Sequence, residues 1–162
     1  EQLKKFKKEY DNYKNKIRKN KTINGEPHTG EESKILPRLF QSILDQELVR
    51  SGTVLNGKAS LVFNFRDPDY GPVRGGFHPV EIRLLKRRDR WQFDYVTDFS
   101  YQGPEDMAEL VKEIDFNFLS EEYYLLRYGQ MGPASARDLY TMWESNFVSY
   151  YQMGVFTVSV SG

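Results

Sequence analysis

The sequence contains no cysteine and only two histidines, His28 and His78. The absence of cysteine excludes disulfides, thiolate catalysis and cysteine-ligated zinc or iron–sulfur centres. Two imidazoles are too few for a multi-histidine metal centre. No stretch of the chain approaches the ~18 consecutive apolar residues that a membrane-spanning helix needs. The composition therefore predicts no metal, no cofactor and no membrane span.

The formal net charge of the whole chain is zero, but its parts are charged. The 162 residues carry 23 Lys and Arg against 23 Asp and Glu. Residues 1–22 hold nine basic and three acidic residues, a balance of +6, so the remainder carries −6. From residue 89 onward, 4 basic residues stand against 12 acidic ones. The neutral total argues against a globally basic nucleic-acid binder, and the split indicates a basic arm on an acidic body.

The arm, residues 1–22, has the pattern of an amphipathic helix. Its apolar side chains follow a heptad stripe: Leu3, Phe6, Tyr10, Tyr13 and Ile17. A stripe of this kind is typical of a helix that packs against a partner. Residues 23–35 are rich in turn-forming residues and are interpreted as a linker. Residues 36–162 are long enough for one domain with its own core.

The domain begins and ends with helical patterns that enclose strand patterns. Helices are predicted over residues 36–50 and 133–152, because apolar residues recur there at helical spacing. Alternation of apolar and polar residues predicts strands at 58–66, 78–86, 91–99, 113–119, 123–128 and 155–160. Tight turns between successive strands indicate an α+β fold. We expect a twisted antiparallel β-sheet of about six to seven strands, flanked by N-terminal and C-terminal helices.

The central hairpin allows a register to be predicted. A four-residue loop at 87–90 pairs Lys86 with Trp91, Leu84 with Phe93, Ile82 with Tyr95, Val80 with Thr97 and His78 with Phe99. One face of the hairpin is then largely apolar. On the other face, the register sets Arg83 against Asp94 and places Asp98 on the same polar side. His78 would lie at the rim of the apolar face.

The stretch from residue 64 to residue 81 is the richest in polar side chains. The candidate binding residues are Arg66, Asp67, Asp69, Tyr70, Arg74, His78 and Glu81. Asp67 and Asp69 have oxygens suited to a hard cation, although Asp-Pro and Gly-Gly sequences are also ordinary turn formers. An enzyme using this polar site remains an alternative, with His78 as the histidine available for proton transfer. The turn interpretation is favoured, and no residue is predicted to be catalytic.

Two basic clusters suggest a second alternative, nucleic-acid binding. The possible contacts are Lys4, Lys5 and Lys8 in the arm and Arg87, Arg88 and Arg90 at the hairpin tip. Lysine and arginine on exposed surfaces neutralise phosphates. The aromatic residues of the arm fall on the heptad stripe, where packing is favoured over stacking on bases. Nucleic-acid binding is therefore not the favoured interpretation.

Several strings occur together in an order that resembles a known family. They are NFRDPDYGP, GGFHPVEI, YVTDFSYQG, KEIDFNF and LYTMWESNFVSYYQMGVF. The chain from residue 36 onward resembles the bacterial family called domain of unknown function 2787. A member of that family has a fold similar to the mitochondrial acidic matrix protein that binds the globular heads of complement. The resemblance implies a twisted sheet whose terminal helices pack together, oligomeric assembly, and binding of partners through charged surfaces.

These observations favour a non-enzymatic interaction protein of the bacterial cytoplasm, with export as the open alternative. We expect a homo-oligomer, either a dimer or a trimer, that contacts an unknown protein partner. The resemblance would give the arm a packing partner in the last helix, although residues 155–160 add a strand after that helix. The family brings no established catalytic residues to this chain.

Overall fold

The computed structural model describes residues 35–162, which form two α-helices and one seven-stranded sheet. The helices are α2 (Gln41–Ser51) and α3 (Pro133–Gln152), and a short 3-10 helix spans Glu105–Met107. The strands are β1 (Ser60–Arg66), β2 (Val80–Arg87), β3 (Arg90–Gln102), β4 (Glu109–Asn117), β5 (Glu122–Leu125), β6 (Gly129–Gln130) and β7 (Thr157–Ser161). The predicted arm helix and nearly all of the linker lie outside these residues. The heptad stripe, its pairing and the contacts of Lys4, Lys5 and Lys8 therefore stay predictions.

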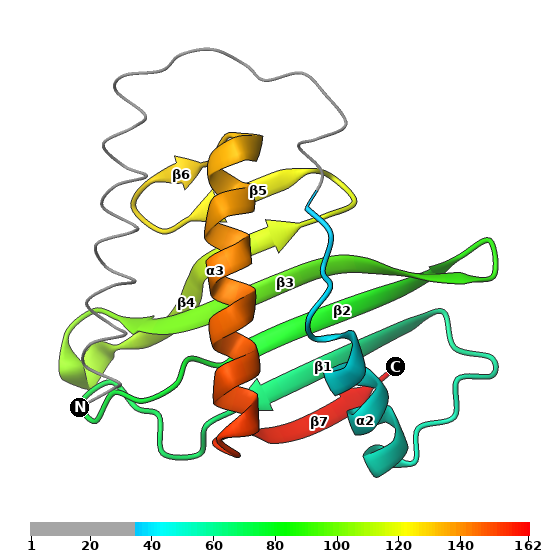
Figure 1. Cartoon of the computed structure of the whole chain (residues 1–162). Helices are drawn as coiled ribbons and strands as arrows, with labels where there is room; N and C mark the ends of the chain where they lie inside the picture. Colours follow the sequence, from blue (N-terminus) through cyan, green and yellow to red (C-terminus); the bar gives the residue numbers. More distant parts are fainter. Residues whose placement is uncertain (1–34) are drawn as a thin grey trace.

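The sheet is antiparallel throughout, with the strand order β6-β5-β4-β3-β2-β1-β7. Successive strands are neighbours except β7, which follows α3 and returns to pair with β1. Figure 1 shows α3 lying across one face of the sheet, with α2 on the same side above β1 and β7. The predicted α+β fold, with its strand number and flanking helices, is confirmed. Among residues 35–162, no helix has the length and apolar composition to cross a membrane.

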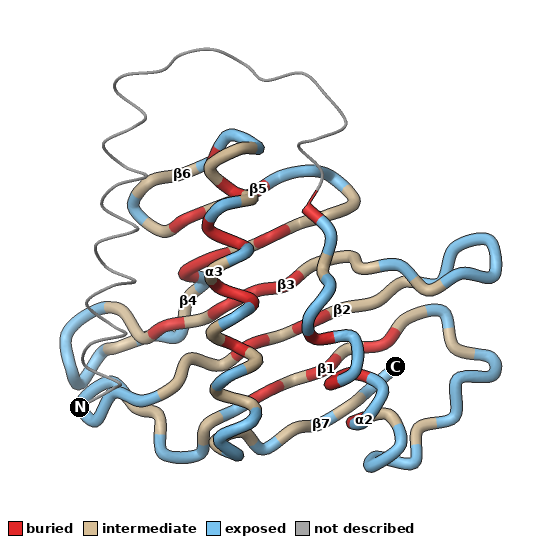
Figure 2. Tube along the Cα trace, viewed as in Figure 1, coloured by how far each residue is buried: buried red, intermediate tan, exposed pale blue. Residues whose placement is uncertain are grey.

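The core lies between these helices and the sheet (Figure 2). Phe40, Phe63, Phe65, Phe116 and Leu139 are among its fully buried side chains. Alternate residues of a strand point to opposite faces, so each strand supplies one buried row. We call the face beneath α2 and α3 the covered face and the opposite one the open face. No described element covers the open face.

The first helix begins later than predicted, at Gln41 rather than near residue 36. The segment that precedes this helix is bound to α3. The buried carboxylate of Glu144 accepts hydrogen bonds from the backbone N–H groups of Arg38 (3.1 Å) and Leu39 (3.0 Å). The hydroxyl of Tyr140 also donates to Glu144. Backbone amides that would enter a helix are therefore satisfied by tertiary hydrogen bonds, and the segment stays outside the helix.

The β2–β3 hairpin follows the predicted register near its tip. Two pairs near the turn are as predicted: Lys86 with Trp91, and Leu84 with Phe93. The turn itself holds two residues rather than four, Arg88 and Asp89, with φ values of 49° and 61°. Positive φ at both positions is the geometry of the tight hairpin turn whose twist matches that of the strands.

A β-bulge beyond Leu84 overturns the rest of the predicted register. The pairs are Ile82 with Val96 and Val80 with Asp98, while His78 lies before β2 and does not pair with Phe99 in the ladder. The extra residue in β3 is Asp94, which has no ladder partner in β2. It reverses the alternation of the strand, so the fully buried Val96 takes the place on the covered face that the prediction gave to Tyr95. Asp98 therefore points to the covered face, not to the polar face.

A second irregularity follows in the β3–β4 ladder. Asp98 pairs with Ile114, but the next residue, Phe99, pairs with Lys112. Glu113 is thus the extra residue of β4. Bulges re-aim side chains, and here the two bulges bring two carboxylates to the same place on the covered face.

Candidate functional site

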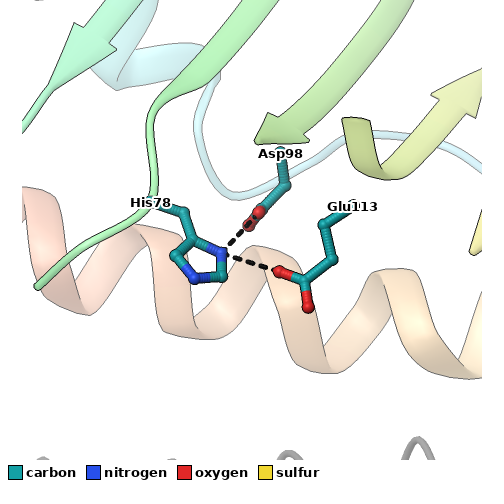
Figure 3. Close-up of side chains that lie close together, drawn as sticks. All are labelled: His78, Asp98 and Glu113. Carbon is teal, nitrogen blue, oxygen red and sulfur yellow. Dashed lines mark hydrogen bonds and ion pairs between the residues drawn. The ribbon is translucent and has the colours of Figure 1, made fainter. Parts of the chain in front are cut away.

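His78 lies at the centre of the most concentrated group of ionisable side chains on the covered face. It belongs to the loop that enters β2, whereas Asp98 comes from β3 and Glu113 from β4. The Nδ1 atom of His78 is 2.7 Å from Oδ1 of Asp98 and 2.9 Å from Oε2 of Glu113. Figure 3 shows both carboxyl groups directed at this nitrogen. We call these three residues the histidine cluster.

The helix α3 closes one side of the histidine cluster. The indole Nε1 of Trp143 donates a hydrogen bond to Oδ2 of Asp98 at 3.0 Å. Asp98 and Glu113 are buried, while His78 is half-buried. Burying two carboxylates is unfavourable unless donors and positive charge compensate them. The imidazole and the indole are the groups that supply this compensation to Asp98.

The environment raises the pKa of His78 to about 10. Burial alone lowers this pKa, but the negative charge of Asp98 and the hydrogen bonds to both carboxylates outweigh it. His78 is therefore an imidazolium at neutral pH. A histidine that keeps its proton cannot accept one, so His78 is unsuited to act as a general base.

Among the described residues, the same three side chains form the group whose donor atoms are close enough to suggest a metal site. Their donor atoms all lie within 4.8 Å of one another. Donors around a tetrahedral zinc ion stand ~3.3 Å apart, because each lies about 2 Å from the metal. The separations of 2.7 and 2.9 Å at Nδ1 are instead those of charge-assisted hydrogen bonds. In this arrangement the imidazolium of His78 forms ion pairs with both carboxylates.

Tyr70 packs beside the histidine of the cluster. Its ring centroid is 5.4 Å from that of His78, and its hydroxyl accepts a hydrogen bond of 3.1 Å from the backbone N–H of Tyr101. Burial, with the nearby negative charges of Glu113 and Asp98, raises the pKa of the Tyr70 hydroxyl. Tyr70 thus stays neutral beside the ion pairs.

Asp67 organises the loop that carries Tyr70 and His78. Its Oδ1 accepts from the backbone N–H of Asp69 at 2.9 Å, and its Oδ2 accepts from the N–H of Phe77 at 3.0 Å. Gly76 has a φ of 131°, and a Cβ atom there would lie 2.8 Å from Oδ2 of Asp67. The favoured turn interpretation of Asp67 agrees with this geometry, because both carboxylate oxygens cap local backbone amides.

The other predicted site residues lie apart from the cluster. Arg66, Asp69 and Arg74 are exposed. Glu81 follows Val80 by one residue and so points to the open face, where the hydroxyl of Tyr95 donates to its Oε2 at 2.6 Å. Of the seven predicted residues, Tyr70 and His78 are in ring contact, and Asp67 holds the loop that carries both. The set does not converge on one pocket.

The open face carries its own polar contacts. Arg83 and Asp94 form an ion pair of 2.7 Å, although the ladder partner of Arg83 is Tyr95 and not Asp94 as the predicted register had it. Thr97 donates to Asp115 at 2.8 Å, and Lys112 lies 3.6 Å from the same carboxyl group. Beside them is a shallow hollow of about 580 Å³ lined by Gln102, Val111, Lys112, Asp115, Tyr124, Leu126, Arg127 and Gln130.

Sequence reasoning missed Asp98 and Glu113 as partners of His78. Each lies at a β-bulge, and a bulge breaks the period of two from which the faces of a strand are predicted. The acidic residues themselves were visible in the sequence. Their convergence on one histidine was not.

The comparisons with known proteins agree on one family. The profile of a family described as a protein of unknown function (DUF2787) matches residues 38–161. Two solved structures from Vibrio cholerae are similar. The hypothetical protein VC0508, from the VSP-II pathogenicity island, is 29% identical with a TM-score of 0.70, over 85% of this chain and all of the other. The conserved hypothetical protein VC1805, from pathogenicity island VPI-2, is 35% identical with a TM-score of 0.64, over 75% of this chain and 91% of the other.

The description of VC1805 adds that it shares structural homology with the human P32 protein. No curated protein matches this chain. The family and the fold relationship expected from the sequence strings are thereby confirmed.

Proposed function

We propose that this chain, which belongs to the DUF2787 family, is a non-enzymatic, self-associating interaction protein of the bacterial cytoplasm. It would form a dimer or trimer and bind a protein partner through a charged surface. One observation carries the proposal: the seven-stranded sheet has helices on a single face among the described residues, and its other face is polar. The described homology of VC1805 to human P32 supports an interaction role by analogy of fold.

The open face has the composition of a protein-binding surface. Arg83 and Tyr95 lie half-buried on this face, each beside an acidic residue of the neighbouring strand. Tyr124 and Arg127 line the adjacent hollow. Tyrosine and arginine are enriched at interfaces, because they combine large contact areas with hydrogen-bonding groups. The pairing of charges within the face leaves a mosaic of both signs, which favours a partner with a complementary mosaic.

The histidine cluster supports the non-enzymatic part of the proposal. His78 holds its proton at neutral pH, and its Nδ1 is engaged by two carboxylates. Asp98 is engaged in turn by Trp143. Groups that saturate one another stabilise a fold, whereas acid–base catalysis needs a group poised to exchange a proton.

The partner surface is tested by charge reversal on the open face. The variant Lys112→Glu/Arg127→Glu changes two exposed basic residues beside the hollow, and the control Arg74→Glu/Lys86→Glu makes the same charge change at two exposed positions off the open face. Tagged proteins are used to capture partners from a lysate of the bacterium that encodes the chain, and each captured protein is purified for calorimetric titration. We expect at least a tenfold weaker affinity for the open-face variant and wild-type affinity for the control. Equal affinities, or no partner that binds the purified wild type, would contradict the proposal.

Self-association is tested separately by light scattering at physiological salt and micromolar concentration. We expect a mass two or three times that of the chain, which is 19.1 kDa. A monomer under these conditions would rule out the oligomeric part and leave the partner surface to be judged by its own experiment.

The hairpin tip favours nucleic-acid binding as a second candidate function. Arg87, Arg88 and Arg90 are all exposed at a two-residue turn, so their guanidinium groups are accessible to phosphates. Fluorescence anisotropy with RNA and DNA oligonucleotides, at salt concentrations from about 50 to about 200 mM, tests this function. Replacing the three arginines by glutamate, or deleting residues 1–22, should weaken binding and reduce its salt dependence. Unchanged binding in both variants would exclude these contacts.

A further inference from the structure

The two edges of the sheet differ in how they are protected. At one edge, β6 contains two residues, Gly129 and Gln130. At the other, β7 contains five residues, Thr157–Ser161, with no charged residue and no proline. Its pairing with β1 is regular over the whole strand. Natural edge strands are usually kept from pairing further by shortness, charge, proline or a bulge. β6 has the first of these protections, and β7 has none of them.

The outer side of β7 is a template for another strand. Alternate residues of a strand direct their N–H and C=O groups to opposite sides, so only part of the backbone of β7 bonds to β1. Among residues 35–162, no strand pairs with its outer side. Val158 and Val160 pack against the core, while Thr157, Ser159 and Ser161 are exposed on the open face.

We propose that β7 pairs antiparallel with β7 of a second copy of this chain, about a two-fold axis at Ser159. This proposal rests on the self-association proposed above and names its interface. With the axis there, Ser159 faces Ser159 of the partner subunit, Val158 faces Val160 of the partner subunit, and Thr157 faces Ser161 of the partner subunit. Valines then align with valines on the covered face, and hydroxyl groups with hydroxyl groups on the open face. The two seven-stranded sheets become one continuous sheet.

The absence of charge identifies a second copy as the occupant. An isologous interface sets each residue against a residue of the same surface, so a charged edge would repel itself near the axis. A neutral edge with alternating Val and Ser or Thr complements itself. A charged partner strand would find no ionic group in β7 to complement its charge.

The helices next to β7 carry exposed apolar residues. Met153 ends α3 just before β7, and Val49 lies in the last turn of α2. Both are exposed. Figure 1 shows α3 ending beside the start of β7 and α2 lying over the end of β7. Antiparallel pairing brings the start of one strand to the end of the other, so the α3 end of one copy approaches α2 of its partner.

The chain contains no cysteine, which makes a register-specific cross-linking test direct. In Ser159→Cys the two thiols would face each other across the axis, and opposed residues in antiparallel strands lie within disulfide range. In the control Thr157→Cys, the two thiols would stand ~13 Å apart, four strand residues along the ladder, which is too far for a bond. We expect air or copper-phenanthroline oxidation to yield mostly covalent dimer for Ser159→Cys and mostly monomer for Thr157→Cys.

A second variant tests the same interface without cysteine chemistry. Ser159→Lys places two like charges directly opposite each other at the axis, on an exposed position where the monomer tolerates lysine. We expect the dissociation constant from sedimentation equilibrium to rise at least tenfold, with an unchanged circular dichroism spectrum. The matched substitution Ser120→Lys, in the exposed turn between β4 and β5, should leave the dissociation constant unchanged.

Each outcome decides one part of the proposal. An oligomeric wild type that neither cross-links through Ser159→Cys nor weakens with Ser159→Lys has its interface elsewhere, which overturns the β7 pairing and leaves self-association intact. Cross-linking of Thr157→Cys instead of Ser159→Cys overturns the assigned axis. A monomeric wild type overturns both the pairing and the proposed self-association.

Discussion

Two ion pairs on opposite faces of the sheet share nearly the same distance and burial, yet they differ in how they respond to their surroundings. His78 and Asp98 on the covered face approach to 2.7 Å, with side chains 32% and 11% exposed. Arg83 and Asp94 on the open face also approach to 2.7 Å, with side chains 34% and 14% exposed. The first cation is a histidine that a change of pH can discharge. The second is an arginine that stays charged.

The number of anions per cation also differs. The imidazolium of His78 faces two carboxylates, from Asp98 and Glu113, whereas Arg83 pairs with Asp94 in the contacts described. The comparison teaches that a contact distance does not define the energy of an ion pair. Stoichiometry, the ability of the cation to titrate and the neutral donors around it decide the energy.

The largest difference in stability between the two ion pairs should appear when the aspartate of each pair is replaced by alanine. Asp98→Ala leaves the imidazolium of His78 with one carboxylate fewer and the buried indole N–H of Trp143 without its acceptor. We expect a loss of ~3–5 kcal/mol in the free energy of unfolding. Asp94→Ala, matched in exposure, should cost about 1 kcal/mol. Urea denaturation at neutral pH measures both, and equal losses would contradict the distinction drawn here.

The pH dependence should be the next largest effect. The pKa of His78 is raised to about 10 in the folded state, against about 6.5 when unfolded. The stabilisation is therefore fully present below about pH 6.5 and is lost as pH rises from there through about 10. We expect ~2–4 kcal/mol of stability to disappear over this range.

Urea denaturation at pH values of about 6, 8 and 10 measures that loss. The variant His78→Gln should not show this loss of unfolding free energy as pH rises. The variant Arg83→Gln should still show it, because the arginine pair does not titrate in this range. A wild type and a His78→Gln variant with parallel pH profiles would show that His78 is not held as an imidazolium.

Removing the neutral donor of the cluster, the indole of Trp143, should cost less stability than the changes above. Trp143→Phe removes the indole N–H that bonds Asp98 and keeps an aromatic ring next to Phe147, whose centroid is 5.2 Å from that of Trp143. We expect a loss of ~1–2 kcal/mol. Thermal denaturation compares it with Trp91→Phe near the hairpin tip, where the loss should be smaller. The reverse order would mean that the indole stabilises the fold by packing alone.

The smallest effect should come from the cation of the open face. Arg83→Ala should cost ~0.5–1 kcal/mol, because the guanidinium that it removes is about one-third exposed on the face that no described element covers. The cost should shrink when urea denaturation is repeated in about 1 M salt, where the Debye length falls to about 3 Å. A cost that is independent of salt would indicate that the aliphatic stem of Arg83, rather than its charge, supplies the stabilisation.

Local patterns predicted the elements well where one period governed the packing. The helix near the C-terminus was predicted at residues 133–152 and occurs at Pro133–Gln152, because its buried residues recur at helical spacing on one side. The tip of the β2–β3 hairpin was predicted for the same kind of reason. The pairs next to a turn depend on a few neighbouring residues, and their register is confirmed.

The candidate site could not be predicted from such patterns. Residues 64–81 were treated as one polar group, yet Val80 and Glu81 point to opposite faces, so Glu81 is separated from His78 by the sheet itself. Asp98 was placed on the polar face because a regular strand would put it there. The bulge at Asp94 turns it over, and an extra residue in a ladder leaves no signature in the spacing of apolar residues.

By itself the sequence determined the split between a basic arm and an acidic body, the α+β class and the absence of cysteine chemistry, since composition and periodicity are properties of the chain alone. The tertiary structure decided which acids meet the single histidine of the body. Two strands, the loop that enters a third and one helix, distant in sequence, must come together before Asp98, Glu113 and Trp143 can surround His78. The pKa of that histidine is then a property of the folded sheet, because the charges that raise it are neighbours only there.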